Sequence, residues 1–362
     1  MGAMTDNSAI SANPDWEHAR ERLTAFWEHE LIDRPCVQVY VDPPWIPAAA
    51  ADLAELGVSA TDYWTRPDSF FQVERHRYRR RQFLGDALPV LYPNWAGVPQ
   101  MMGAQVVYDA ETLWVHAPAE TPGEVSGSGL RVDAPEVDDL VGWLSHCAEQ
   151  GAGECFVGFP AMGNAGDHLA QVLDYQNLCL ALYDDPEGVL RLEAAITQLW
   201  KGVYDRAFTA INGHMAGSCG WLPAWHPRRS ALIEFDFAAM ISPDQFRLFL
   251  PHLIERAEYV ERSIYHVDGP DALIHLDTIL AQPEFDAIQW EPGAGGGGLL
   301  EWLPVLHRIQ AAGKCLYVGY HGWRPDEVLQ AFRELDPAGV ILPVQTHSAD
   351  EAQRFLDAVA AL

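Results

Sequence analysis

The stretch IEFDFAAMISPDQ, residues 233–245, contains the pattern that decides the fold. Apolar and acidic residues alternate over its first five positions, which is typical of a strand with one buried face. A helix start follows, because Ser242 has the place of a capping residue, Pro243 the first helical position and Gln245 the third. We therefore predict a strand at the beginning of this stretch and then a helix that runs to about residue 262.

The same alternation continues to the C-terminus. Further strands are predicted over residues 263–267, 285–290, 314–320 and 339–344, each followed by a helical pattern. Strands that alternate with helices indicate a parallel sheet covered by helices. An open doubly wound sheet is the alternative, but it favours a glycine-rich phosphate turn, and no GxGxxG or P-loop pattern occurs. Five strand–helix units in succession therefore favour the second half of a barrel.

The first half of the chain is less regular. Strands are predicted over residues 35–41, 88–92 and 154–159, and a helix from Pro186 to about Phe208. We predict an α/β fold with a single (β/α)8 TIM barrel over residues 21–362, preceded by an N-terminal extension. Residues 1–20 are expected to be a tag remnant and a flexible N-terminus, because the chain begins with Met-Gly-Ala-Met.

Composition narrows the class of partner. The formal net charge of −28 over 362 residues argues against nucleic acid and against an anionic membrane surface. We find no signal peptide and no run of eighteen apolar residues, and we therefore expect no membrane segment. Six scattered cysteines without a CxxC pair fit reduced thiols. We expect a cytoplasmic protein that acts on a small molecule.

Polar side chains gather at the predicted strand ends. In barrels of this type the catalytic groups come from the carboxyl ends of the strands. His266 and Asp268 lie two residues apart and share one strand face, where they can bind a metal or act as a base with its orienting carboxylate. We predict as catalytic residues Asp236, Tyr265, His266 and Asp268. We predict as substrate-binding residues Tyr92, Asn94, Glu234, Gln289, Trp290, Tyr320 and His321. His321 and His347 each follow an apolar strand, and with His266 they could converge on one ion.

Several motifs of this chain resemble one superfamily. They are DFAAMISP at 236–243, SIYHVDGP at 263–270 and IQWEPGAG at 288–295, with weaker matches at Asp33-Arg34-Pro35 and around Gly166-Asp167. Together they resemble the uroporphyrinogen decarboxylase-like superfamily over nearly the whole chain, most strongly over 234–295. The resemblance implies a (β/α)8 barrel. The superfamily includes the decarboxylase of haem synthesis and methyltransferases that move methyl groups between corrinoids and thiols.

The resemblance also implies a metal site. The corrinoid-dependent methyltransferases bind zinc through a His-x-Cys motif and a later Cys. His266 and Asp268 stand at the His-x-Cys positions, and His347 stands near the later Cys. The implied ligands are therefore His266, Asp268 and His347, a set richer in nitrogen and oxygen that can still hold zinc.

Three functions follow from these patterns. The leading hypothesis is metal-assisted methyl transfer, with a corrinoid protein or a small methylated substrate as the partner. The first alternative is a metal-free decarboxylase or lyase acting on a small carboxylic acid, in which Asp236 or Asp268 stabilises a developing cation and His266 or Tyr265 donates a proton. The second alternative is a catalytically inactive barrel that binds a ligand or a partner subunit. By analogy with the superfamily we expect a homodimer.

Overall fold

The computed structural model describes residues 10–42, 49–125, 127–162, 165–293, 295–319 and 322–362. In this part of the chain the central feature is a seven-stranded sheet with the order β2-β1-β11-β10-β9-β8-β7. Its strands are β1 (Cys36–Val41), β2 (Gln82–Gly85), β7 (Ser230–Ile233), β8 (Arg262–Asp268), β9 (Ala287–Glu291), β10 (Cys315–Val318) and β11 (Val340–Thr346). Neighbouring strands run parallel except for β2, which is antiparallel to β1.

Two small strand pairs lie outside this sheet. β3 (Val90–Leu91) pairs in parallel with β6 (Phe156–Val157), and β4 (Gln105–Tyr108) pairs antiparallel with β5 (Leu113–His116). The backbone N–H of Phe159 donates to the carbonyl oxygen of Cys219, with the nitrogen and oxygen 2.9 Å apart. The chain beyond β6 therefore lies beside the segment before β7. The fold is α/β, as predicted. The hydrogen bonds of the described strands do not show the predicted closed ring.

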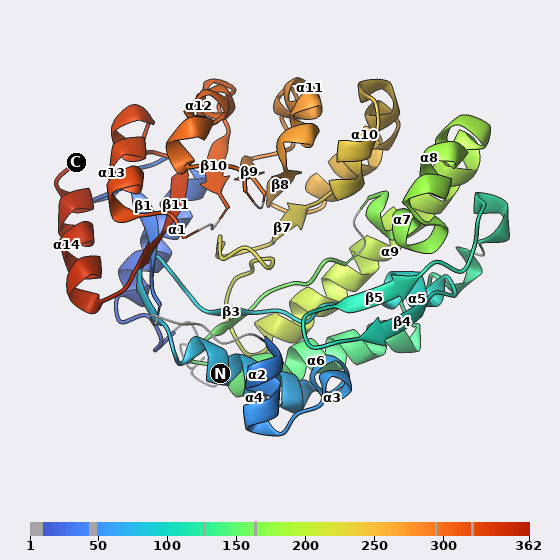
Figure 1. Cartoon of the computed structure of the whole chain (residues 1–362), viewed down its shortest axis with the longest axis horizontal. Coiled ribbons are helices and arrows are strands. Elements are labelled where there is room, and N and C mark those ends of the chain that lie inside the picture. Colours follow the sequence, from blue (N-terminus) through green and yellow to red (C-terminus); the bar gives the residue numbers. More distant parts are fainter. Residues whose placement is uncertain (1–9, 43–48, 126, 163–164, 294, 320–321) are drawn as a thin grey trace, which may run out of the picture.

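Helices follow the parallel strands and lie on the outer side of the arc of strands (Figure 1). After β7 to β11 come α10 (Pro243–Ala257), α11 (Leu276–Leu280), α12 (Leu303–Ala311), α13 (Pro325–Glu334) and α14 (Ala349–Ala360). The first half contributes α1 (Trp16–Trp27), α2 (Ala49–Leu56), α3 (Ala60–Thr65), α4 (Pro67–Tyr78), α5 (Gly97–Met101), α6 (Pro135–Gly151), α7 (Asp167–Leu173), α8 (Tyr175–Asp184) and α9 (Pro186–Asn212). The 3-10 helices are η1 (Pro122–Glu124), η2 (Gly127–Gly129), η3 (Asp236–Met240), η4 (Pro270–His275) and η5 (Leu299–Trp302). None of the described helices combines the length and the apolar character that crossing a lipid bilayer requires.

The order of strands and helices in the second half is confirmed, and so are its helix starts. The Ser242 hydroxyl accepts from the Gln245 backbone in a full capping box, and Ser348 caps α14 in the same manner. Two predicted boundaries are wrong. The strand predicted over residues 233–237 shares only Ile233 with β7, which begins at Ser230 and ends at Ile233. The helix predicted to reach residue 262 ends at Ala257.

The predicted N-terminal extension also needs correction from residue 10 onward. Ile10 is buried, and the side chain of Asn13 donates to the carbonyl oxygens of Gly85 (3.0 Å) and Ala87 (2.7 Å). Helix α1 already begins at Trp16, so a boundary at residue 20 cuts through it. The reason is packing, because Trp16 and the following apolar residues of α1 are part of the core.

A buried carboxylate joins this N-terminal helix to the sheet. Asp86, directly after β2, is completely buried. It accepts hydrogen bonds from Arg22 of α1 (2.6 Å), from Arg34 (2.7 Å) and from the backbone N–H of Val37 in β1 (2.7 Å). Three segments that are distant in sequence therefore meet at one charge. Removing that charge leaves two buried guanidinium groups without their main counter-ion.

We predict that Asp86→Asn lowers the free energy of unfolding by about 3–5 kcal/mol, the usual cost of breaking a buried ion pair. Urea denaturation measures the difference. Asp33→Asn is the matched control, because Asp33 also pairs with Arg22 (3.1 Å) but its side chain is 57% exposed. It is expected to cost less than about 1 kcal/mol. Equal effects of the two variants would contradict the role given to Asp86.

Candidate functional site

Three potential ligand side chains meet at the carboxyl ends of β7 and β8. One ligand atom from each of Asp236, His266 and Asp268 lies within 4.8 Å of the other two. The Nε2 atom of His266 is 3.5 Å from Oδ1 of Asp236. The imidazole is only 6% exposed, whereas the Asp236 side chain is 52% exposed. The group therefore has a buried nitrogen donor and remains accessible from solvent.

Asp236 reaches this position because the chain turns sharply after β7. The two carboxylate oxygens of Asp167, the first residue of α7, accept from the backbone N–H groups of Asp236 (3.0 Å) and Phe237 (2.7 Å). These donors would otherwise continue the strand, and capping them starts η3 instead. This contact is the physical reason why the predicted strand ends early. Asp167 is a residue that our sequence predictions did not include among the site residues.

A buried ion pair holds Asp167 in place. The backbone N–H of Gly166 donates to Glu193 of α9 at 3.0 Å, and Glu193 pairs with Arg256 of α10 at 2.5 Å. Both charged side chains are almost completely buried. Gly166 has φ +48°, and a Cβ there would collide with the ring of Phe235, so this turn requires glycine. In the sequence, the Gly166-Asp167 pair was the signal that could have indicated Asp167 as a site residue.

The protonation of His266 is set by a chain of hydrogen bonds from β9. His266 is paired in register with Gln289, and Asp268 with Glu291. The Gln289 amide nitrogen donates to the Glu291 carboxylate at 3.2 Å. A carboxylate only accepts, so the amide oxygen of Gln289 is the atom that faces Nδ1 of His266. Nδ1 must therefore carry a hydrogen, so Nε2, which faces Asp236, is the ring nitrogen that can coordinate a metal.

This tautomer favours a cation in the cluster. The lone pair on Nε2 and the carboxylate oxygen of Asp236 are both acceptors, and at 3.5 Å they repel unless a positive charge lies between them. A divalent ion bound to Nε2 and to the carboxylates of Asp236 and Asp268 relieves that repulsion, and so does a proton. One nitrogen and two oxygen donors suit zinc and harder divalent ions. Three protein ligands are typical of metal sites that leave a position open for substrate.

Trp221 covers one side of the imidazole. Its ring centroid is 5.3 Å from that of His266, with the planes at 84°. The indole N–H donates to the carboxylate of Glu234, which is 7% exposed. Glu234, predicted to bind substrate, therefore positions Trp221 through this contact.

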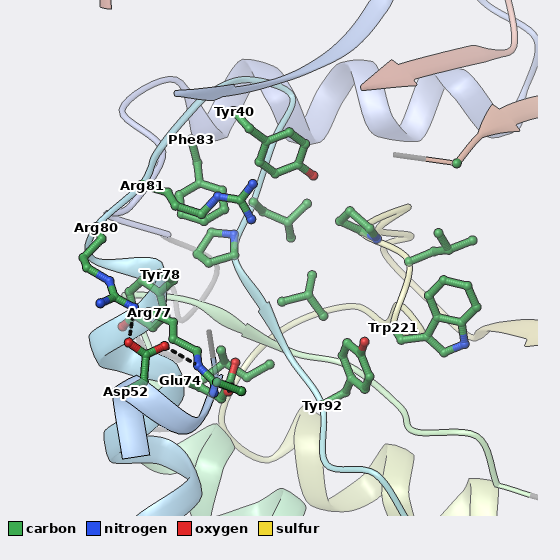
Figure 2. Close-up of a pocket in the computed structure, with 18 of the residues that line it drawn as sticks. Tyr40, Asp52, Glu74, Arg77, Tyr78, Arg80, Arg81, Phe83, Tyr92 and Trp221 are labelled. Atoms are coloured by element: carbon green, nitrogen blue, oxygen red, sulfur yellow. Dashed lines mark hydrogen bonds and ion pairs between the residues drawn. The ribbon is translucent and has the colours of Figure 1, made fainter. Parts of the chain in front are cut away.

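A cavity of about 590 Å³ lies next to Trp221 (Figure 2). Trp221 and Glu291 line it, and each also belongs to the surroundings of His266: Trp221 by ring contact, Glu291 through Gln289. Tyr92, predicted to bind substrate, lies in the cavity wall as well and is 37% exposed. The site therefore consists of a polar cluster and a larger cavity, and Trp221 and Glu291 of the cavity wall connect the two.

Other predicted site residues are elsewhere. His347 is exposed and does not belong to the cluster of potential ligands; its backbone N–H donates to Glu351 at 2.8 Å. Asp236 takes the third place, because η3 turns back over β8 whereas His347 follows β11, three strands from β8. The prediction of His347 as a ligand is corrected accordingly.

Two aromatic residues point away from the cluster. Tyr265 alternates with His266 along β8 and packs on Phe285, with the ring centroids 4.8 Å apart. Burial raises its pKa well above the usual value, and Tyr265 is therefore a poor proton donor. Trp290 alternates with Gln289 in the same way and packs on Trp302 (4.8 Å). Both are core residues, which corrects their predicted roles in catalysis and in substrate binding.

The other residues predicted to bind substrate lie in different places. Gln289 is completely buried and contacts His266, so it acts through the imidazole. Asn94 is exposed and belongs neither to the cluster nor to the described lining of the cavity. Tyr320 and His321 lie outside the described residues.

A second group of potential ligands, Asp52, Glu55 and His76, also satisfies the 4.8 Å criterion among the described residues. The carboxylate of Asp52 already pairs with Arg77 at 3.0 Å and with Arg80 at 2.6 Å. Its charge is therefore compensated by the protein, which makes this group the weaker candidate for a metal.

Two neighbouring carboxyl groups, those of Asp236 and of Asp167 behind it, have raised pKa values. Burial raises the pKa of Asp167 well above 3.8, and the nearby charge of Asp236 adds to the effect. Burial also raises the pKa of Asp236. The charge of His266 opposes this shift, and the charge of Asp268 adds to it. The exposure of the Asp236 side chain lets solvent weaken these effects.

Comparison with models of known protein families and with curated proteins found no match to this chain. The superfamily resemblance of the sequence therefore remains a prediction.

We predict that Asp167 and Asp236 of the metal-free protein make a contribution to the free energy of unfolding that falls as the pH rises from about 4, and that Asp236→Asn makes this contribution smaller. Burial raises the pKa of these two carboxyl groups in the folded state, so the folded protein binds their protons more tightly than the unfolded chain does. Their ionisation therefore lowers the free energy of unfolding as the pH rises through the folded pKa, and this penalty disappears at low pH. Urea denaturation between pH 4.5 and 8 measures the slope. An unchanged or steeper slope in the variant would contradict the coupling of Asp236 to Asp167.

Proposed function

We propose that this chain is a metal-assisted enzyme whose ion is held by Asp236, His266 and Asp268. The observation that carries the proposal is the convergence of three ligand atoms, one of them on a buried imidazole whose Nε2 is free for coordination. This set keeps His266 and Asp268 from the sequence prediction and replaces His347 by Asp236. Zinc fits the donor set, and so do harder divalent ions.

We also propose that the chain is a member of the uroporphyrinogen decarboxylase-like superfamily with a closed (β/α)8 barrel. The described parallel strands β1, β3, β6 and β7 to β11 support this, since they occur in the order that such a barrel requires. The hydrogen bond from Phe159 to Cys219 supports the closure on one side, because it brings the chain beyond β6 next to the segment that precedes β7.

Residues around the ion have separate tasks in this proposal. A bound divalent ion supplies Lewis acidity to a substrate atom in the open position. Gln289 holds the proton on Nδ1 and thereby orients His266, as outer partners of metal-bound histidines commonly do. Trp221 covers the imidazole and excludes water from that side. Asp167 fixes the turn that presents Asp236.

The reaction that we propose first is methyl transfer from a small methylated substrate, or with a corrinoid protein as partner. It is supported by the motifs of residues 236–295 and by a potential metal site at His266 and Asp268, where the resemblance implies one. No cysteine joins the described cluster, and burial raises the pKa of Cys219, the cysteine closest to Trp221 in sequence. A donor set of nitrogen and oxygen leaves the ion more acidic than thiolate ligands would.

A second candidate is metal-free decarboxylation or lyase chemistry on a small carboxylic acid. The observation that favours it is the raised pKa of Asp236 beside His266. A carboxyl group that keeps its proton to higher pH can act as a general acid, with the imidazole as its partner.

Metal content of the protein decides between these candidates. Protein washed with chelator, incubated with Zn²⁺ and freed of excess ion is expected to retain about one ion per chain. His266→Ala is expected to abolish retention with little change in the melting temperature. Gln289→Leu is expected to weaken affinity about 10- to 100-fold, because it removes only the outer partner of the imidazole.

His347→Ala is the control, and it is expected to bind zinc like the unaltered protein because His347 lies outside the cluster. Absence of ion in the unaltered protein would favour the metal-free candidate. Equal loss in His347→Ala and His266→Ala would refute the assignment of the ligands.

A further inference from the structure

The two sides of the 590 Å³ cavity differ in chemistry, with arginines on one side and a tryptophan on the other. It lies between β1, β2, β3, the end of α4, the segment 221–223 and β10. Figure 2 shows Arg77, Arg80 and Arg81 on one side and Trp221 on the opposite side. Its volume is in the range of pockets that hold organic ligands of moderate size. The arrangement of its lining therefore restricts what kind of ligand fits.

Six aromatic residues contribute to the wall of the cavity, together with aliphatic residues of the segments 88–91 and 222–223. The aromatic residues of the described lining are Tyr40, Tyr78, Phe83, Tyr92, Trp221 and Tyr317. Several are fixed: Tyr40 packs edge-on against Phe83 at 5.8 Å, and the Tyr317 hydroxyl donates to Gln38 at 2.7 Å. Rings held in this way favour a flat, unsaturated ligand, which can stack or pack edge-on against them.

The arginine side can bind an anion. Arg80 donates one N–H to Asp52 at 2.6 Å, and Arg77 shares the same carboxylate. A guanidinium group has five N–H donors in a planar fork, so Arg80 keeps donors for a ligand in the cavity that it lines. That fork matches the two oxygens of a carboxylate.

The charge of this region differs from that of the chain as a whole. Five arginines fall within residues 75–81 of a chain whose net charge is −28. Of these, Arg77, Arg80 and Arg81 line the cavity and pair with Asp52, Glu74 and Asp42, whereas Arg75 and Arg79 share Glu154. The side of the cavity at the end of α4 therefore concentrates guanidinium groups, oriented by carboxylates, in a chain with few basic residues.

Two residues of the cavity lining connect it to the metal-ligand cluster. Trp221 contacts the His266 ring, and Glu291 is connected to the same ring through Gln289. We infer that the cavity binds an aromatic carboxylate, with its carboxylate on the side of Arg80, its ring between the tyrosines and its far end near Trp221 and His266. The placement of the reacting end rests on the proposed function, but binding of the ligand does not require the ion.

Calorimetric titration of the full-length, chelator-washed protein tests this inference with two probes. 2-Naphthoate has the ring and the carboxylate, and 2-naphthamide has the same shape without the charge. We expect 2-naphthoate to bind at least about ten times more tightly, a difference of about 1.4 kcal/mol. Equal affinity of the two probes would overturn the inference, and so would no binding of 2-naphthoate at millimolar concentration.

Two neighbouring arginines give a matched pair of variants. Arg80→Gln is expected to weaken 2-naphthoate about tenfold without affecting 2-naphthamide, and Asp52 keeps its ion pair with Arg77. Arg79→Gln is the control, because Arg79 is adjacent and 56% exposed but does not line the cavity. Equal weakening by the two variants would overturn the assignment to Arg80. If Arg80→Gln fails to fold, the comparison of the two probes on the unaltered protein decides alone.

The His266→Ala variant separates this inference from the proposed function. It is expected to lose the ion and still to bind 2-naphthoate at least about ten times more tightly than 2-naphthamide, because Arg80, which would hold the carboxylate, is unaltered. Ligand binding without any metal site would leave the cavity assignment standing and refute the metal-assisted reaction. A bound ion without binding of 2-naphthoate would leave the metal site standing and refute the cavity assignment.

Discussion

The parallel order of β7, β8 and β9 is the constraint on which the candidate site depends. Parallel strands end at a common edge, so the residues that follow β7 and the last residues of β8 and β9 must lie side by side. Register then determines which of them meet. Gln289 is opposite His266 and Glu291 is opposite Asp268, which gives two adjacent rows of polar side chains on one face. The site is therefore a consequence of strand order and register together.

Two sets of hydrogen bonds turn this placement into specific chemistry. Glu291 orients Gln289, and Gln289 orients His266, so a charge at the cavity wall determines which imidazole nitrogen is free. Asp167 ends the strand at β7 and brings Asp236 over the neighbouring strand. The same Glu291 carboxylate faces the cavity. Cavity and cluster are thus connected through the Gln289 amide, in addition to the contact of Trp221 with the His266 ring.

Much of the fold could be predicted from the sequence, because it depends on local patterns. Hydrophobic periodicity and the capping boxes gave the order of elements in the second half, and alternation along β8 correctly placed His266 and Asp268 on one face. The same alternation, applied to Tyr265 and Trp290, would have removed both from the site. The error there was to treat every polar or aromatic residue of a strand end as facing inward.

The remaining errors concern contacts between segments distant in sequence. Asp167 caps a turn seventy residues away, and nothing near position 236 predicts that interruption of the strand. The choice of His347 followed a family pattern of cysteines, whereas strand order places it beyond β11 and away from β8. The cavity joins residues from segments between β1 and β10 that are distant in sequence, and no local pattern in the sequence brings them together.

X-ray absorption spectroscopy of the zinc-loaded protein tests the central claim most directly, since it identifies the donor atoms around the ion. The account predicts one imidazole and otherwise oxygen donors at about 2.0–2.2 Å, from Asp236, Asp268 and solvent or substrate. Sulfur scattering at about 2.3 Å, or the absence of an imidazole signal, would contradict it.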